Sequence, residues 1–108
     1  MSIGFHRSAS RHGISPARVI HVIDNCPCPI YPAGSQADEE DLVLFLWMDQ
    51  HGIPLEVIAV EGAEGSLVVI HAMRMRPTYV AQYAEVLKST AHSGDAQYDW
   101  TFRATARL

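Results

Sequence analysis

Three apolar segments in the middle of the chain are separated by short polar connections. They are residues 42–48 (LVLFLWM), 54–60 (PLEVIAV) and 67–72 (LVVIHA). The connections DQHG and EGAEG contain glycine, which favours tight turns between antiparallel strands. We therefore predict a three-stranded antiparallel meander. Because the strands are apolar on both faces, one face should pack on helices and the other should meet a partner chain or a second copy.

Two short helices are predicted before this sheet. Residues 3–12 can form a helix that ends at Gly13, since glycine tolerates a positive φ. Ser15 and Pro16 are a helix-start signal, with serine as the N-cap and proline at the first helical position. From there a second helix is expected to run to about Asp24.

A third helix is predicted after the sheet. Pro77 suits a first helical position, and the helix is expected to extend to about Lys88. Its apolar residues form one stripe at helical spacing: Val80, Tyr83, Ala84 and Leu87. The order α-α-β-β-β-α predicts a small α+β domain in which helices pack on one antiparallel sheet.

The chain is expected to form one α+β domain over residues 1–88, followed by a tail over residues 89–108. A length of 108 residues gives room for a single modest core. In the tail, three aromatic residues alternate with other residues: Tyr98, Trp100 and Phe102. This period of two is typical of an edge strand, which would dock on this chain or on a partner.

Charge is distributed unevenly along the chain. The net charge is −4, but residues 26–70 carry eight acidic residues and no lysine or arginine. Residues 1–25 and residues 71–108 are each net positive by two. If the two ends meet in space, a local basic patch can form on an acidic protein. The alternative is a set of scattered, solvated arginines.

Location and redox state follow from what the sequence contains. No apolar run approaches the ~20 residues that span a bilayer, and the N-terminus has no apolar centre typical of a secretory signal. We therefore expect a cytoplasmic protein. Cys26 and Cys28 lie in a proline-rich loop predicted over residues 25–41 and are interpreted as reduced thiols, with metal binding as the alternative.

The segment from His71 to Pro77 is a candidate phosphate site. Arg74 and Arg76 would point to one side of an extended chain, and His71 to the other side unless a twist or bulge intervenes. Two guanidinium groups beside the first N–H groups of a new helix suit a phosphate. The alternative is a surface arginine pair beside a hydrogen-bonded strand histidine.

Proton transfer could come from histidine or glutamate. A histidine exchanges a proton near neutral pH, which makes His12 and His71 candidates; His12 could equally cap a helix, and a two-histidine metal site would require the fold to join them. Glu56 and Glu61 lie on an apolar strand, where a carboxylate needs a partner such as an arginine. The functional alternative makes Glu61 a general base.

These features resemble the BrnT-like toxins, which belong to the broad RelE-like group of type II toxin–antitoxin systems. The resemblance covers roughly residues 6–87. It rests on the Arg11–Ser15 segment (RHGIS), a short helix, a three-strand meander with glycine turns, and an arginine-bearing strand end that leads into a helix. It implies a compact α+β ribonuclease that cleaves RNA without metal and is held inactive by a DNA-binding antitoxin from a neighbouring gene.

The chain also departs from that family. The third strand of the family typically ends in Ile-Ser-Ala-Arg-Arg, whereas this chain has Ile70-His71-Ala72-Met73-Arg74. RelE-like toxins also tend to be basic.

Two functions are therefore carried forward. In the first, an RNA-cleaving toxin, Arg74 and Arg76 hold the phosphate while His12, His71 and Glu61 transfer protons, without metal or cofactor. Three further residues would contact RNA: Arg7, Arg11 and Tyr79. In the second, the same toxin-like fold is a non-catalytic interaction module that binds a partner or forms a homodimer.

Overall fold

The computed structural model describes residues 2–32 and 41–94. The elements in chain order are β1 (Ile3–Phe5), η1 (Arg7–Ser10), α1 (Pro16–Asn25), β2 (Asp41–Met48), β3 (Pro54–Glu61), η3 (Ala63–Gly65), β4 (Leu67–Arg74), η4 (Pro77–Tyr79) and α2 (Val80–Gly94). The η elements are single turns of 3-10 helix.

The sheet has four strands in the order β1-β4-β3-β2. The β2, β3 and β4 strands are antiparallel neighbours, as the apolar segments predict. The short β1 strand adds to the edge of β4 in parallel, which makes the sheet mixed. The protein is thus an α+β fold with a four-stranded sheet and two α-helices in its described part, rather than a three-stranded sheet with three helices.

The first segment is where the predicted and observed elements differ most. Residues 3–12 were expected to be helical, but Ile3–Phe5 is a strand and only Arg7–Ser10 makes a 3-10 turn. A helix this short is marginal by itself. The parallel ladder gives its backbone better partners, since Leu67 N–H donates to Ser2 O at 2.8 Å and His6 N–H donates to Val69 O at 2.9 Å.

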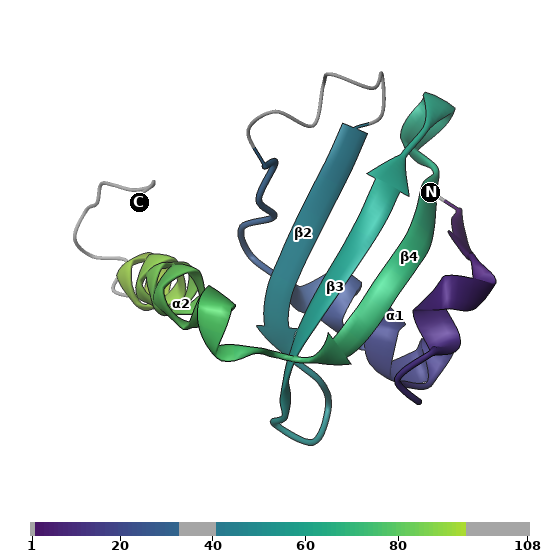
Figure 1. Ribbon diagram of the computed structural model, residues 1–108. Coiled ribbons are helices and arrows are strands. Elements are labelled where there is room, and N and C mark those ends of the chain that lie inside the picture. The colour runs from purple at the N-terminus through teal and green to yellow at the C-terminus, as the bar shows by residue number, and fades with distance from the viewer. Residues whose placement is uncertain (1, 33–40, 95–108) are drawn as a thin grey trace.

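α1 covers one face of the sheet, behind the strands in Figure 1. Its start matches the predicted signal, because the Ser15 hydroxyl accepts the N–H of Arg18 and Pro16 is the first helical residue. Gly13, which was expected to end the first segment with a positive φ, has φ of +76°. The buried side of the helix contacts β2 and β3, and the inward residues of β4 complete the core. The core cluster comprises Ala9, Ile14, Val19, Val22, Ile23, Val43, Phe45, Leu55, Val57, Ala59, Leu67, Val69 and Ala72.

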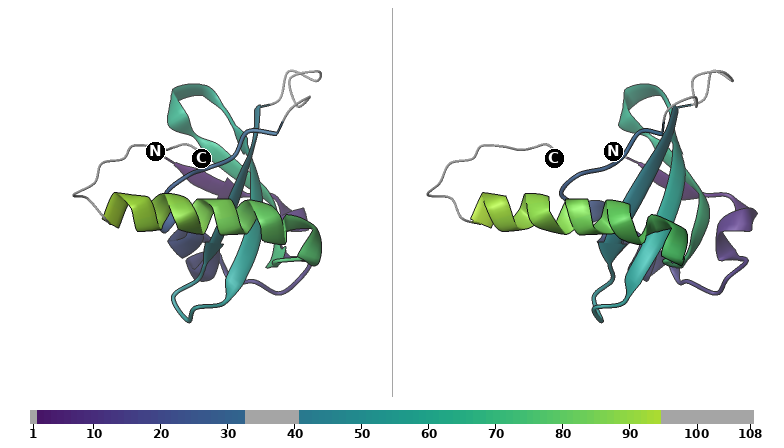
Figure 2. Two further views of the ribbon diagram at one scale, coloured as in Figure 1. Left: turned by 90° about the vertical axis from the view of Figure 1, so that its left-hand side faces the viewer. Right: turned by 60° about the vertical axis from the view of Figure 1, so that its left-hand side comes forward.

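α2 follows η4, contacts β2 and continues to Gly94, past the boundary predicted at residue 88. Figure 2 shows its C-terminal part projecting beyond the sheet. The predicted stripe packs only in part, through Tyr83. Val86 is buried, whereas Val80 and Leu87 are 56% and 38% exposed. Tyr83 contacts the Trp47 ring edge-on, with centroids 6.5 Å apart.

The predicted edge strand of the tail, with Tyr98, Trp100 and Phe102, lies outside the described residues. Within residues 2–32 and 41–94, none of the helices has the length and apolar character that a bilayer crossing requires.

Candidate active site

A β-bulge in β4 decides which way His71 points. Ala59 of β3 pairs with Val69, but Ile58 pairs with His71, so Ile70 is an extra residue in β4. Leu67 and Val69 face the core with α1, and two residues further on His71 would face it too in a regular strand. The bulge turns His71 to the opposite face of the sheet, which it shares with Ile58.

On that face, Glu56 is the centre of a hydrogen-bonded cluster. Its side chain is 0% exposed. Oε2 accepts the Nε2–H of His71 at 2.8 Å and two N–H groups of Arg76, from Nε at 2.9 Å and Nη2 at 2.6 Å. Oε1 accepts the backbone N–H of Arg76 at 2.9 Å. Oε2 thus accepts three bonds and Oε1 accepts one, so both oxygens of the buried carboxylate are hydrogen-bonded.

These bonds set the charge state of the cluster. Burial alone would raise the pKa of Glu56, but hydrogen bonds from Arg76 and His71, together with the charge of Arg76, outweigh it and lower the pKa. The hydrogen bond to Glu56 in turn raises the pKa of Arg76. Glu56 is therefore ionised at neutral pH and acts as the acceptor towards His71.

His12 reaches the same cluster from the other end of the chain. Its ring lies edge-on against the His71 ring, with centroids 5.7 Å apart and planes at 72°. It follows η1, which packs beside β4. The two chain ends therefore meet at this face, as the charge distribution allows. His12 is exposed, while His71 is half-buried.

Arg76 lies beyond the end of β4, where the chain has turned towards the cluster. β4 ends at Arg74, which pairs with Leu55 and so shares the α1 face. After the N–H of Met75 donates to Pro54 O, the chain turns and Arg76 bonds Glu56 on the opposite face. The two arginines thus do not point the same way, contrary to the extended-chain expectation.

Of the remaining predicted RNA contacts, Tyr79 touches the cluster. The Tyr79 ring is under the Arg76 guanidinium, with Cζ 5.9 Å from its centroid. The Tyr79 N–H, expected to be free for a phosphate, donates to Arg76 O within η4. Arg7 in η1 and Arg11 at its C-cap are both exposed.

Glu61 lies elsewhere. It pairs with Asp41 and Leu67 at the far end of the sheet, five residues along β3 from Glu56. At ~3.4 Å per residue this is roughly 17 Å. The structure does not bring Glu61 to the histidines. The carboxylate beside His71 is that of Glu56. The signal for Glu56 was present, because a carboxylate on an apolar face needs a partner.

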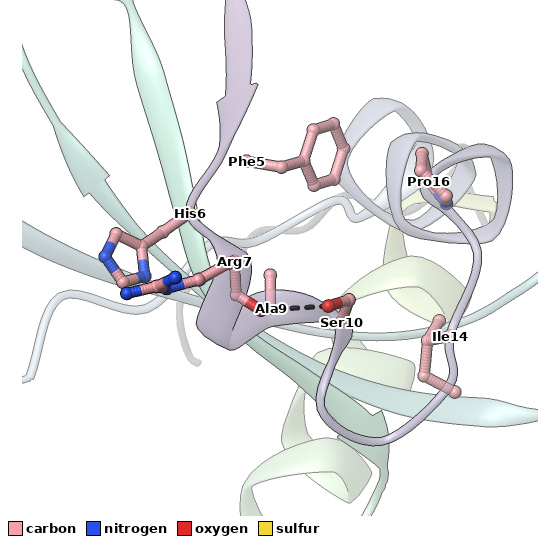
Figure 3. Close-up of a pocket in the computed structure, with 7 residues that line it drawn as sticks. All are labelled: Phe5, His6, Arg7, Ala9, Ser10, Ile14 and Pro16. Atoms are coloured by element: carbon pink, nitrogen blue, oxygen red, sulfur yellow. Dashed lines mark hydrogen bonds between the residues drawn. The ribbon is translucent and has the colours of Figure 1, made fainter.

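A hollow of about 140 Å³ lies between η1 and the start of α1 (Figure 3). Its lining includes the apolar side chains of Phe5, Ala9, Ile14 and Pro16. The side chains of His6 and Arg7 lie together on one side of it. The hollow contains no residue of the Glu56 cluster.

Both cysteines are free thiols. The Cys26 S–H donates weakly to Leu46 O at 3.7 Å, and burial raises the pKa of Cys26. Among the residues that the structure describes, no group of three or more histidine, cysteine or acidic side chains could hold a metal ion.

The site is thus a buried carboxylate that joins an imidazole and a guanidinium, with a second imidazole beside them. Comparison of the chain with protein families, with curated proteins and with solved structures gave no match.

Proposed function

We propose that this protein is a metal-independent endoribonuclease in which His71, backed by Glu56, accepts the proton that starts RNA cleavage. The observation that carries the proposal is the 2.8 Å bond from His71 Nε2–H to the buried Glu56 carboxylate. This bond leaves Nδ1 of a neutral His71 as the proton acceptor. A carboxylate behind an imidazole fixes its tautomer and stabilises the imidazolium that forms.

The chemistry needs two proton transfers. His71 takes the proton of a ribose 2′-OH as that oxygen attacks the adjacent phosphorus, forming the new P–O2′ bond. The P–O5′ bond breaks, and protonated His12 gives its proton to the leaving 5′ oxygen. The products are a 2′,3′-cyclic phosphate and a 5′-hydroxyl end. Two imidazoles with ring centroids 5.7 Å apart suit this division of labour.

Arg76 supplies positive charge for the phosphate. The Nε–H and one Nη2–H of Arg76 donate to Glu56, so three guanidinium N–H groups remain for a phosphate. The side chain is 49% exposed, so these donors are accessible from solvent. A guanidinium that is already held in place stabilises developing phosphate charge without reorganising. Tyr79, under Arg76, is placed to stack on a base.

The biological setting that we propose is a type II toxin–antitoxin system. Its support is the sequence resemblance to BrnT-like and RelE-like toxins and the α+β fold with an antiparallel meander. A small DNA-binding antitoxin from a neighbouring gene would then cover the Glu56 cluster. Growth arrest on expression, relieved by that neighbour, is the expected phenotype.

The enzymatic proposal is tested with purified protein and single-stranded RNA in the presence of EDTA. We expect cleavage by the wild type and at least a hundredfold slower cleavage by His71→Gln, because general base catalysis contributes roughly 10²–10⁴ in rate. His51→Gln is the matched control. His51 is exposed in the β2–β3 turn and bonds Asp49 through its backbone N–H only. No cleavage by the wild type, or equal cleavage by His71→Gln, would exclude the proposal.

A second candidate is a non-catalytic interaction module. The observation that favours it is the exposure of Val80 and Leu87, which lie seven residues apart on one side of α2. A protein that is harmless on expression and dimeric in solution, and that becomes monomeric with Leu87→Asp, would support this function instead.

A further inference from the structure

The N-terminal segment is attached to the bulge at two successive carbonyl groups of β4. His6 N–H donates to Val69 O at 2.9 Å, and the Ser8 hydroxyl donates to Ile70 O at 2.7 Å. Ile70 is the extra residue of the bulge, which leaves it outside the regular β3–β4 ladder. The hydroxyl of Ser8 therefore provides a partner for a carbonyl at the point where β4 is irregular.

Two overlapping turns lead from Ser8 to the residues on either side of His12. Arg11 N–H donates to Ser8 O at 3.3 Å, and Gly13 N–H donates to Ser10 O at 3.1 Å. Gly13 then takes a positive φ of 76°, which turns the chain into α1. His12 is therefore carried by the turns that begin at the anchored Ser8.

The neighbours of His71 come from three elements. Glu56 of β3 accepts its Nε2–H, Arg76 after β4 shares the same carboxylate oxygen, and His12 after η1 lies against its ring. Of these three, His12 is the one carried by a separate, N-terminal piece of chain. Ser8 fastens that piece beside His71, since Ile70 is the preceding residue.

We propose that Ser8 is a positioning residue: its hydroxyl fixes the N-terminal turn on the bulge so that His12 and His71 act as one pair. The role of this pair in catalysis rests on the proposed ribonuclease function, whereas the positioning itself does not. Ser8 touches neither reacting group, and its effect passes through His12.

The direct readout is the nuclear Overhauser contact between the ring protons of His12 and His71, measured without RNA. We expect this contact in the wild type and a loss of at least threefold in intensity in Ser8→Ala. Ser10→Ala is the matched control, because the Ser10 hydroxyl donates to Arg7 O inside the same turn. It should keep the wild-type contact.

A second pair of variants separates the hydroxyl from general packing. Ser8→Thr and Ser8→Val have nearly the same shape, and only threonine keeps the hydroxyl. Ser8→Thr should keep the His12–His71 contact and Ser8→Val should lose it, in proteins with matching core methyl spectra. An equal contact in both variants, or a full contact in Ser8→Ala, would overturn the assignment.

Activity gives a distinguishable second readout. If the protein cleaves RNA, Ser8→Ala should lower kcat about tenfold with KM unchanged. A displaced general acid stabilises the transition state less, whereas substrate binding is not affected. If it does not cleave RNA, the ring contact still decides the role of Ser8. Failure of the nuclease proposal and failure of the positioning proposal therefore give different results.

Discussion

At the scale of single residues, Glu56 is the group on which the candidate site depends. It is a buried carboxylate with both oxygens hydrogen-bonded, and both of its side-chain partners are proposed functional residues. The same bonds that orient His71 and Arg76 also hold the β4–η4 junction against β3. Glu56 therefore contributes both to stability and to the proposed activity, and a variant at this position has to be measured for both.

Replacing this carboxylate separates the two contributions. Glu56→Gln removes the charge and cannot accept four hydrogen bonds, so we expect the free energy of unfolding to fall by about 2 kcal/mol. Urea unfolding measures this loss. RNA cleavage by the folded variant should fall at least tenfold, because His71 loses its orienting partner. Unchanged stability would contradict the assigned bonds, and unchanged cleavage would remove Glu56 from the mechanism.

Asp49 is the second buried carboxylate, and it has a structural role. Burial alone would raise the pKa of Asp49, but the N–H of Ile53, the Arg18 side chain and the N–H of His51 outweigh this and lower it to about 2. Its Oδ1 accepts the two backbone N–H groups of the β2–β3 turn, and Oδ2 accepts Arg18 Nε at 2.7 Å. One side chain thus joins the turn to α1.

This residue predicts a pH window for stability. The pKa of Asp49 is lower in the folded state, so the unfolded chain takes up the proton first as pH falls. Its contribution is complete above about pH 4 and is lost as pH falls to about 2. Asp49→Asn should be less stable at pH 7, and the difference from the wild type should shrink across this window. Urea unfolding at several pH values measures it; a constant difference would contradict the low pKa.

Residue types were easier to predict than residue partners. The sequence indicated His71, His12 and Arg76 as candidates, and the structure brings His71 and Arg76 to Glu56 and His12 to His71. It could not show which glutamate they meet, because the register of β3 against β4, with its bulge, decides which carboxylate lies beside His71. Arg74 was grouped with Arg76 by the same parity, which holds only while the chain stays extended.

At the scale of elements, local signals located most of the fold. The meander follows from apolar runs and glycine turns, and α1 follows from Ser15 and Pro16, since each signal lies next to the element that it predicts. β1 could not be found this way. Ile3 pairs with Leu67, and a three-residue strand owes its existence to a partner that is remote in sequence.

The bulge is the element-scale feature that the site requires. Deleting Ile70 would restore a regular ladder in which His71 directly follows Val69 and so stays on the Glu56 face. We expect the free energy of unfolding to fall by about 1 kcal/mol, because the Ser8 hydroxyl loses the Ile70 carbonyl. Urea unfolding measures the change. Deletion of Ala63, in the η3 turn, is the control for shortening the chain outside the strands.

The contrast between the two deletions tests this geometry. The Ile70 deletion should keep the His71–Glu56 bond, visible in the nitrogen chemical shifts of the imidazole, but lose the His12–His71 ring contact, whereas the Ala63 deletion should keep both. Loss of the His71–Glu56 bond in the Ile70 deletion would contradict the pairing of His71 with Ile58.

At the scale of the whole molecule, the fold brings the two ends of the chain together at β4. The positive charge lies in the two ends of an acidic chain. By adding β1 in parallel to β4, the protein places η1 and the following turn beside the last strand (Figure 1). The second end contributes His71 and Arg76 at that same strand, so residues from both ends form one site.

The measurement that tests this account most directly uses the RNA itself. The wild-type protein is incubated in EDTA with an oligoribonucleotide and with the same oligomer carrying a single 2′-deoxy nucleotide at the cleavage position. The account predicts cleavage of the first to a 2′,3′-cyclic phosphate, and no cleavage of the second at that position, because His71 has no 2′-OH proton to take. Cleavage of the 2′-deoxy position, or no cleavage of either oligomer, would contradict it.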